Sequence, residues 1–327
     1  MSRQTLAFLV KLAISAALIA FLVNRVQFGP LIARFQNMSP GWAALALPIF
    51  LFQLAITGWR YGLIVRVVGL VLPIAEAIRL LLIGHFFSQT LPSAIGGDAV
   101  RAYMTTRLGL SWGRAVSAVL CDRGVGMLVL LFIATATIPI FIDRVADASL
   151  RLFALVPALA AFSGLAVLVA ANNARIAWAA RWRLARPFAL LIGDLRRVVI
   201  ASAESPVIVM ISLLAQLSAI TSVWLLGKAL RLDIAFLDCL VLMPPIFVVT
   251  LVPVSIAGWG IREAAMVFAF GLVGVTEADA LGLSVATGLC QIVAGIPGGL
   301  IWLARGRPAV GVPAPPAPRP TSGTGNP

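Results

Sequence analysis

Two arginines in this chain each follow a proline and a glycine at the same spacing, which is a pattern that could bind an anionic group. Residues 92–101 read P-x-x-I-x-G-x-x-x-R, and residues 253–262 repeat the pattern 161 positions later. Pro92 and Pro253 each interrupt an apolar stretch. A guanidinium binds phosphate through paired hydrogen bonds, and paired breaks in the two halves of a membrane protein indicate a translocation site. The repeat therefore predicts a membrane protein in which the two breaks face a shared polar cavity for an anionic ligand.

The first break has residues suited to starting a helix. Gly96 and Gly97 permit a sharp turn, and Asp98 is a good N-cap for a helix through residue 107. Arg101 then lies in the first turn, beside the unpaired backbone N–H groups. We expect the arginine and this helix start to form one phosphate site.

The second break repeats this arrangement. Gly258 and Gly260 would turn the chain after Pro253, and Arg262 and Glu263 would open the next helix. Arg262 is the second predicted phosphate ligand, and Glu263 is predicted to orient it.

A third pair of charges lies inside an apolar segment. Asp122 and Arg123 occur within residues 114–142, where charges should face the interior of a helix bundle. We predict that Arg123 is a further cation for the phosphate, and that Asp122 and Asp98 orient the arginines. Each pair also has a purely structural interpretation, as an ion pair at the surface or between helices.

The elements that carry these residues are predicted to be membrane helices. We expect an all-α polytopic protein of about eight transmembrane helices, with one or two re-entrant or broken segments and a possible inverted repeat. Residues 1–304 would form the membrane domain, and the proline-rich residues 305–327 a disordered cytoplasmic tail. The predicted apolar segments are residues 5–23, 41–59, 73–91, 114–142, 152–171, 206–227, 235–256, 264–275 and 280–304.

The composition excludes several functional classes. Hydrophobic residues make up 61% of the 327 positions and the net charge is +13, which favours contact with a bilayer and anionic lipids over nucleic acid. With only 12 acidic residues and a single histidine, His85, no metal site or cofactor is expected. No hydrolase or nucleotide-binding motif is present, so the chain is more simply explained as a transporter than as an enzyme. We expect His85 to be a core residue rather than a headgroup ligand.

The loop at residues 172–206 carries six arginines, which places it in the cytoplasm of a multi-pass protein of the bacterial inner membrane. Tryptophan, leucine and phenylalanine are mixed with these arginines. The segment is therefore either an amphipathic helix on the inner leaflet or a plain basic loop.

These residues resemble those of a flippase-like family, the transmembrane region of lysylphosphatidylglycerol synthase. The resemblance covers about residues 5–304 and is carried by three blocks. They are Pro92…Gly96-Gly97-Asp98-x-x-Arg101, Asp122-Arg123, and Gly258-x-Gly260-x-Arg262-Glu263. It implies a membrane protein that handles polar lipids, without the separate aminoacyl-transferase domain of the two-domain relatives. Asp98 and Asp122 stand where the family often has glutamate, which leaves the ligand open.

We therefore predict that the chain moves or binds an anionic lipid, such as a phospholipid, an aminoacyl-lipid or a polyprenyl-phosphate-linked lipid. Arg101, Arg123 and Arg262 would hold the phosphate. One alternative is a membrane-embedded transferase that uses a lipid-linked donor, with Asp98 or Glu263 as the base. Another is a non-catalytic membrane partner of a lipid-modifying enzyme.

Overall fold

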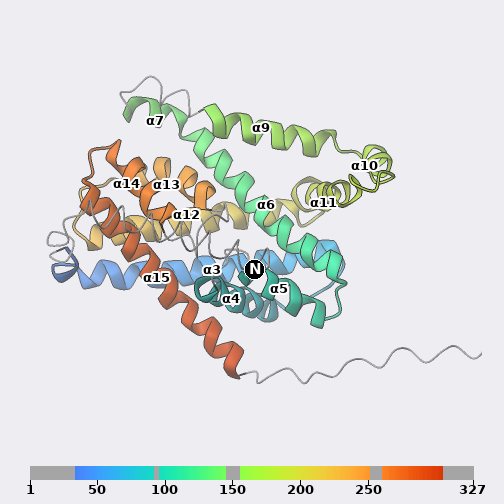
Figure 1. Cartoon of the computed structure of the whole chain (residues 1–327), viewed down its shortest axis with the longest axis horizontal. Coiled ribbons are helices and arrows are strands. Elements are labelled where there is room, and N and C mark those ends of the chain that lie inside the picture. Colours follow the sequence, from blue (N-terminus) through green and yellow to red (C-terminus); the bar gives the residue numbers. More distant parts are fainter. Residues whose placement is uncertain (1–33, 92–95, 145–154, 251–259, 305–327) are drawn as a thin grey trace, which may run out of the picture.

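The computed structural model describes residues 34–91, 96–144, 155–250 and 260–304, and these residues form helices with no strand (Figure 1). The predicted all-α fold class is confirmed. The helices are α3 Pro40–Val68, α4 Ile74–Thr90, α5 Gly96–Arg107, α6 Trp112–Ala136, α7 Ile138–Arg144, α9 Leu155–Ala170, α10 Asn173–Ala179, α11 Arg186–Arg196, the π-helix η1 Arg197–Ala201, α12 Ser205–Ala229, α13 Phe236–Thr250, α14 Ile261–Gly271 and α15 Glu277–Ala304.

Four of the described helices, α3, α6, α12 and α15, are long and apolar enough to cross a membrane. A fifth span is possible if α9 and α10, which meet at 94°, are counted together. The spans expected at residues 41–59, 114–142 and 206–227 correspond to three of the long helices, and the fourth, α15, contains the stretch 280–304 that was expected only as a short apolar piece. The span expected at residues 5–23 lies outside the described residues, and the total of about eight stays a prediction.

The apolar segment 114–142 is divided in the structure, because α6 ends at Ala136 and α7 begins at Ile138. Between them, the Thr137 hydroxyl donates to the carbonyl oxygens of Ile133 and Ala134, each at 3.0 Å. A threonine that bonds back to the preceding turn is often found where a helix bends or ends.

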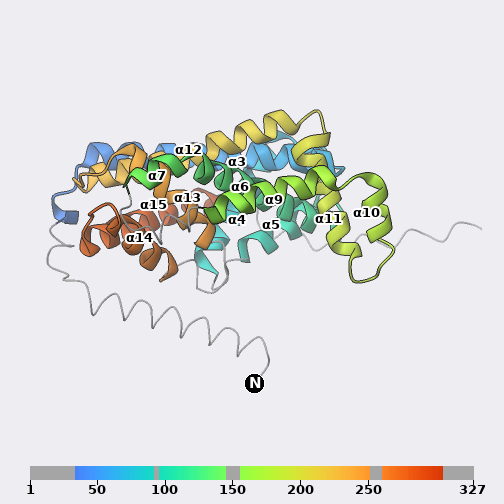
Figure 2. The same cartoon turned by 90° about the horizontal axis from the view of Figure 1, so that it is seen from above.

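Helices α3 and α12 lie side by side along the length of the described bundle (Figures 1 and 2). The two largest apolar clusters of the described residues form most of its core. One surrounds Phe270 and Met243 near α13 and α14, and the other surrounds Tyr61 and Leu80. The four side chains named here are fully buried. The second cluster includes Cys121, directly before the Asp122–Arg123 pair, and so it supports the charged residues from one side.

Helix α4 packs closely against both α5 and α15, and glycines make this approach possible. A Cβ atom at Gly97 would overlap with the Gly84 carbonyl oxygen and the Ser88 hydroxyl, and one at Gly298 would overlap with the Leu82 carbonyl. Gly97 thus lies inside the first turn of α5, rather than in a turn before it as the sequence suggested. Asp98 is likewise within the helix and is not its N-cap, while the predicted end at residue 107 is confirmed.

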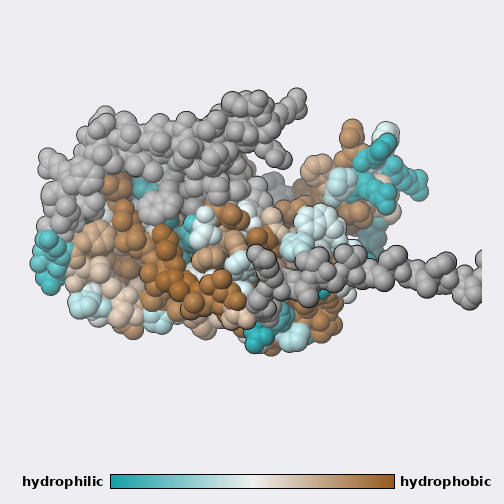
Figure 3. Space-filling model, turned by 60° about the horizontal axis from the view of Figure 1, so that its bottom comes forward, coloured by the Kyte–Doolittle hydropathy of each residue, from teal (hydrophilic) through white to brown (hydrophobic). Residues whose placement is uncertain are grey.

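The described surface carries a broad band of apolar side chains (Figure 3). Large apolar residues on several helices are more than half exposed, including Leu159, Met210 and Leu303. Such an extent of exposed apolar surface indicates contact with lipid rather than water. Together with the four long apolar helices, it identifies a multi-pass membrane protein in contact with the bilayer.

Candidate functional site

A cavity of about 210 Å³ lies between α3, α4, α5, α6 and α12. Its walls combine apolar side chains with a concentration of charge that is unusual inside an apolar bundle. Its lining residues are Gln53, Leu54, Thr57, Arg60, Leu81, Gly84, His85, Ser88, Asp98, Arg101, Asp122, Arg123, Gly126, Met127, Leu130, Ala215 and Gln216. We call this space the polar cavity.

Two arginines hold the buried Asp122 carboxylate. Arg60 donates from Nε to one carboxylate oxygen at 2.9 Å, and Arg101 donates from a terminal nitrogen to the other at 2.9 Å. All three side chains are at most 6% exposed. Arg60 also donates to the Ser212 hydroxyl at 3.1 Å, which links α3 to α12. The carboxylate therefore joins α3, α5 and α6 at one point.

Asp98 continues the network toward the open side of the cavity. One of its carboxylate oxygens accepts from Arg101 at 3.2 Å, and the other accepts from Arg123 Nε at 2.9 Å. The four residues predicted from the first break and from the apolar pair, Asp98, Arg101, Asp122 and Arg123, thus form one continuous network with Arg60.

The Arg101 guanidinium is also supported from its flat face. Its central carbon lies 4.4 Å from the centre of the Tyr61 ring, which is a favourable cation–π distance. The Tyr61 hydroxyl is 2.9 Å from the Thr105 hydroxyl, which itself donates to the Arg101 carbonyl. Arg101 is therefore held on several sides, although its buried Nε has no hydrogen-bond partner among the described residues.

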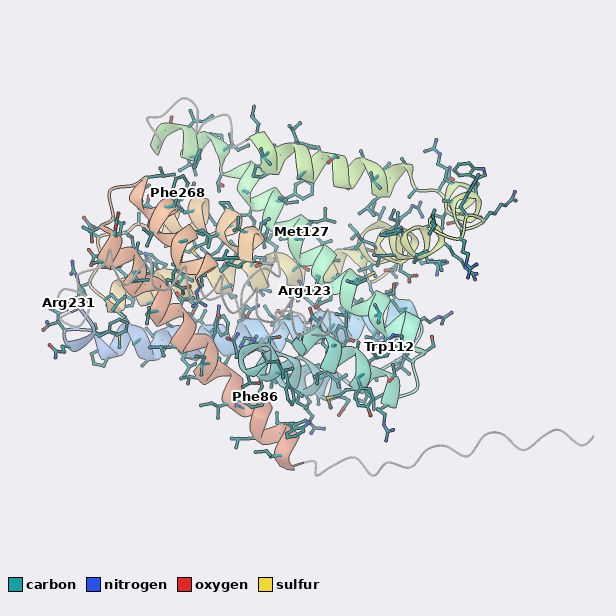
Figure 4. All side chains as sticks on the ribbon, viewed as in Figure 1. Phe86, Trp112, Arg123, Met127, Arg231 and Phe268 are labelled. Atoms are coloured by element: carbon teal, nitrogen blue, oxygen red, sulfur yellow. The ribbon has the colours of Figure 1, made fainter. Side chains whose placement is uncertain are left out.

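Arg123 is the most accessible cation of the polar cavity. Its side chain is 43% exposed, compared with 5% for Arg101. In the described part of the chain, only its Nε makes a hydrogen bond, so the two terminal nitrogens are available to a ligand. Figure 4 shows Arg123 and Met127 on α6 near the middle of the bundle.

Arg262 and Glu263 form a second network and do not line the polar cavity. Arg262 donates to Glu263 at 2.8 Å, to the Ser284 hydroxyl at 3.1 Å and to the Gln291 side-chain oxygen at 3.1 Å. Gly260 has a positive φ of 90°, and its N–H donates to Glu263. As expected, these residues open a helix, α14. Pro92, Pro253 and Gly258 lie outside the described residues.

His85 lines the polar cavity and contacts a residue of the second network. Its ring contributes to the wall of the polar cavity, and its Nε2 lies 3.1 Å from the Gln291 carbonyl oxygen. The same glutamine contacts Arg262 through its side chain. His85 therefore has a hydrogen-bond partner, as expected for a core histidine, and it also faces the cavity.

The sequence analysis did not single out Arg60, Ser212 or Gln216. Arg60 was placed just beyond the end of a predicted span, whereas α3 continues to Val68. A signal was present, because Gln53, Thr57 and Arg60 recur at helical spacing and place polar groups on one face of an apolar helix. All three residues line the polar cavity.

The electrostatic character of the polar cavity favours an anion. Three arginines and two aspartates line it, so one positive charge is left over when His85 is neutral. In the described residues, no group of three potential metal ligands comes together. The arrangement can therefore bind a compact anion through hydrogen bonds to guanidinium groups.

The family model for the transmembrane region of lysylphosphatidylglycerol synthase matches residues 8–299. A search of curated proteins found no match. Because the family model covers most of its length, the chain belongs to this family. It is a multi-pass membrane protein connected with lipid modification or transport.

Proposed function

We propose that this chain binds an anionic polar lipid in the polar cavity and moves its headgroup across the bacterial inner membrane. The observation that carries the proposal is the excess positive charge of a cavity inside an apolar bundle. Three arginines share only two aspartates there, and an anionic headgroup would balance the remaining positive charge.

In this proposal Arg123 makes the first contact with the lipid phosphate, because its terminal nitrogens are available. Arg101 lies behind it and shares Asp98 with it. A phosphate that enters between the two arginines would compete with Asp98 for both. Arg262 would take part from its own network, through Gln291 and His85.

The two simultaneous partners of Asp98, Arg101 and Arg123, suggest how the headgroup could pass. A phosphate that first displaces the carboxylate at Arg123 would leave the Asp98 bond to Arg101 in place, and only deeper entry would compete for Arg101 as well, so that each arginine keeps an anionic partner. Such an exchange lowers the cost of moving a charge through the membrane interior, because no buried ion is left alone. No energy source is needed for movement down a lipid gradient.

The test uses purified protein in liposomes that contain a trace of phosphatidylglycerol with a fluorophore on one short acyl chain, so that the headgroup is unaltered. Loss of label to a membrane-impermeant reductant reports the rate at which the lipid changes leaflet. We expect Arg123→Ala to slow this rate by roughly 10- to 100-fold, which is the usual effect of losing a hydrogen bond to a charged group.

The matched control is Arg114→Ala, which removes an exposed arginine from the same helix but outside the cavity. It should leave the rate unchanged. Equal rates for wild type and Arg123→Ala would refute the proposed site. If no lipid moves and a covalently altered lipid accumulates instead, the transferase alternative is correct.

A further inference from the structure

A second pocket, of about 600 Å³, lies next to the polar cavity and is formed by α6, α7, α9, α13 and α14. We call it the apolar groove. Of the nineteen described residues that line it, eighteen are apolar and none is charged. The exception is Thr137, whose hydroxyl is already used by backbone carbonyls of α6. The groove therefore offers no polar partner and suits a hydrocarbon.

The apolar groove and the polar cavity share one residue, Met127. Met127 follows Arg123 by one helical turn, so the two side chains lie on the same face of α6. Figure 4 shows both near the centre of the bundle, with Phe268 of the groove on α14. A flexible thioether at this junction can adjust to a ligand that passes from one pocket into the other.

The two pockets differ in size as well as in polarity. The polar cavity, at about 210 Å³, is smaller than the usual range of roughly 300–1,000 Å³ for ligand sites, while the groove, at about 600 Å³, lies inside it. A phosphate with a small alcohol suits the first volume better than an oligosaccharide does. A long hydrocarbon chain suits the second.

We infer that the ligand is a lipid with a compact anionic headgroup in the polar cavity and one hydrocarbon chain in the apolar groove. This inference rests on the proposed function and makes it more specific. It favours a phospholipid such as phosphatidylglycerol over a polyprenyl-linked glycan. It also places a chain within the protein, whereas a headgroup that crosses alone would leave both chains in the bilayer.

The experiment uses reconstituted protein and phosphatidylglycerol that carries a photoreactive diazirine in the middle of one acyl chain. After irradiation, the labelled residues are identified by mass spectrometry. We expect labels to concentrate on groove residues of α6, α13 and α14. The same chain on phosphatidylcholine should label the groove several-fold less, because the zwitterionic headgroup gains little from the positive cavity.

Two alanines of α6 provide a matched pair of variants. Ala134 lines the apolar groove, whereas Ala136 is exposed and does not. Ala134→Phe should reduce groove labelling by about tenfold, because the ring displaces methylene groups of the chain. Ala136→Phe should leave it unchanged. Ala160→Phe, on α9, fills the groove from the other side and should act like Ala134→Phe.

The outcomes separate this inference from the proposed function. Even labelling of lipid-facing residues such as Leu45, Phe52 and Leu303 would overturn the inference, as would unchanged labelling in both filled variants. If lipid moves while labelling is even, the proposed function stands and the groove is not used. If the groove is labelled but no lipid moves, the groove binds a chain and the translocation proposal fails.

Discussion

Asp122 is the residue on which the polar cavity most depends, because its carboxylate pairs with two buried arginines at once. Replacing it with asparagine keeps the volume but leaves Arg60 and Arg101 without their shared anion. Breaking a buried ion pair from one side typically costs about 3–5 kcal/mol. We expect Asp122→Asn to lower the melting temperature strongly when unfolding is followed by fluorescence in detergent.

A suitable comparison is Asp279→Asn, which removes a similar carboxylate from a more exposed pair. Asp279 contacts Arg34, whose side chain is 42% exposed. Exposed ion pairs contribute at most about 1 kcal/mol, so this variant should melt close to wild type. Similar melting temperatures for the two variants would mean that the Asp122 network is not structural.

Arg101 and Arg123 differ in burial, and this difference decides which arginine should be replaced first. Arg101 is buried between two carboxylates and the Tyr61 ring, so its removal would disturb the fold together with any binding site. Arg123 has one described partner and is half exposed. A loss of lipid movement in Arg123→Ala therefore reports on binding more directly than the same loss in Arg101→Ala.

At the scale of elements, the contact between α4 and α5 positions Asp98 and Arg101. Gly97 makes this contact possible, since a Cβ there would overlap with backbone and side-chain oxygens of α4. We expect Gly97→Ala to destabilise the protein by about 1–3 kcal/mol, as overpacking usually does. It should also slow lipid movement, because α5 must shift. Both effects can be measured on the same purified variant, by thermal unfolding and by the liposome assay.

Gly113 gives the contrasting case, because a Cβ at this position of α6 would meet nothing within 4 Å. Alanine there should be neutral or stabilising by up to about 1 kcal/mol, since it reduces the freedom of the unfolded chain in a helix. If Gly97→Ala behaves like Gly113→Ala, the two helices are not held at the distance observed.

The segment formed by α10 and α11 has the side chains of an interfacial element. Trp178 and Trp182 are each 62% exposed, Leu184 is 88% exposed and Phe188 is 67% exposed, while arginines lie between them. Aromatic and basic residues together favour the boundary between lipid headgroups and acyl chains. We expect the apolar side chains of this segment to lie in the inner leaflet.

Spin labels can test this placement after the three native cysteines have been replaced by alanine. A label at Leu184→Cys should be relaxed more by oxygen, which concentrates in lipid, than by a water-soluble nickel complex. A label at Arg181→Cys, also exposed, should show the opposite preference. If both positions prefer the nickel complex, the segment is a basic loop in water, which is the alternative that the sequence left open.

For the molecule as a whole, the sequence predicted the positions of helices better than it predicted which helices pack against each other. Most helix positions followed from apolar runs, because a run that is long enough to form a membrane helix can be recognised from the local sequence alone. The break at Thr137 was missed, because a hydroxyl bonding to the preceding turn leaves no mark in hydropathy. The structure brings Asp98, Arg101, Asp122 and Arg123 together in one network, and their role in binding a lipid stays a prediction.

The hydrogen bonds and ion pairs between helices of the site could not be derived from the spacing of residues in the sequence. Arg60 is 62 residues from Asp122, and only the packing of α3 against α6 brings them together. In the same way, the resemblance between the two proline–glycine–arginine patterns did not reveal that Arg262 belongs to a separate network. Contacts between helices depend on how the faces pack, and a single sequence contains little direct information on that.

The connected polar cavity and apolar groove lead to a prediction about the stability of the entire bundle. A ligand that binds only the folded protein stabilises it, by about 2.7 kcal/mol when its concentration is 100 times the dissociation constant. Phosphatidylglycerol added to detergent-purified protein should therefore raise the melting temperature in a concentration-dependent manner. Phosphatidylcholine with the same chains controls for general effects of lipid on the micelle and should raise it less.

The difference between the two lipids, rather than either shift alone, measures the contribution of the charged headgroup. Arg123→Ala should abolish this difference while leaving the smaller shift caused by the chains. Ala134→Phe should keep this difference but reduce the shift in melting temperature for both lipids, because the two lipids have the same chains and the groove would bind a chain. Equal shifts for both lipids in wild type would indicate that the cavity does not select an anion. If Arg123→Ala removes only the headgroup contribution and Ala134→Phe only the chain contribution, the headgroup and the chain bind at adjoining places in one protein.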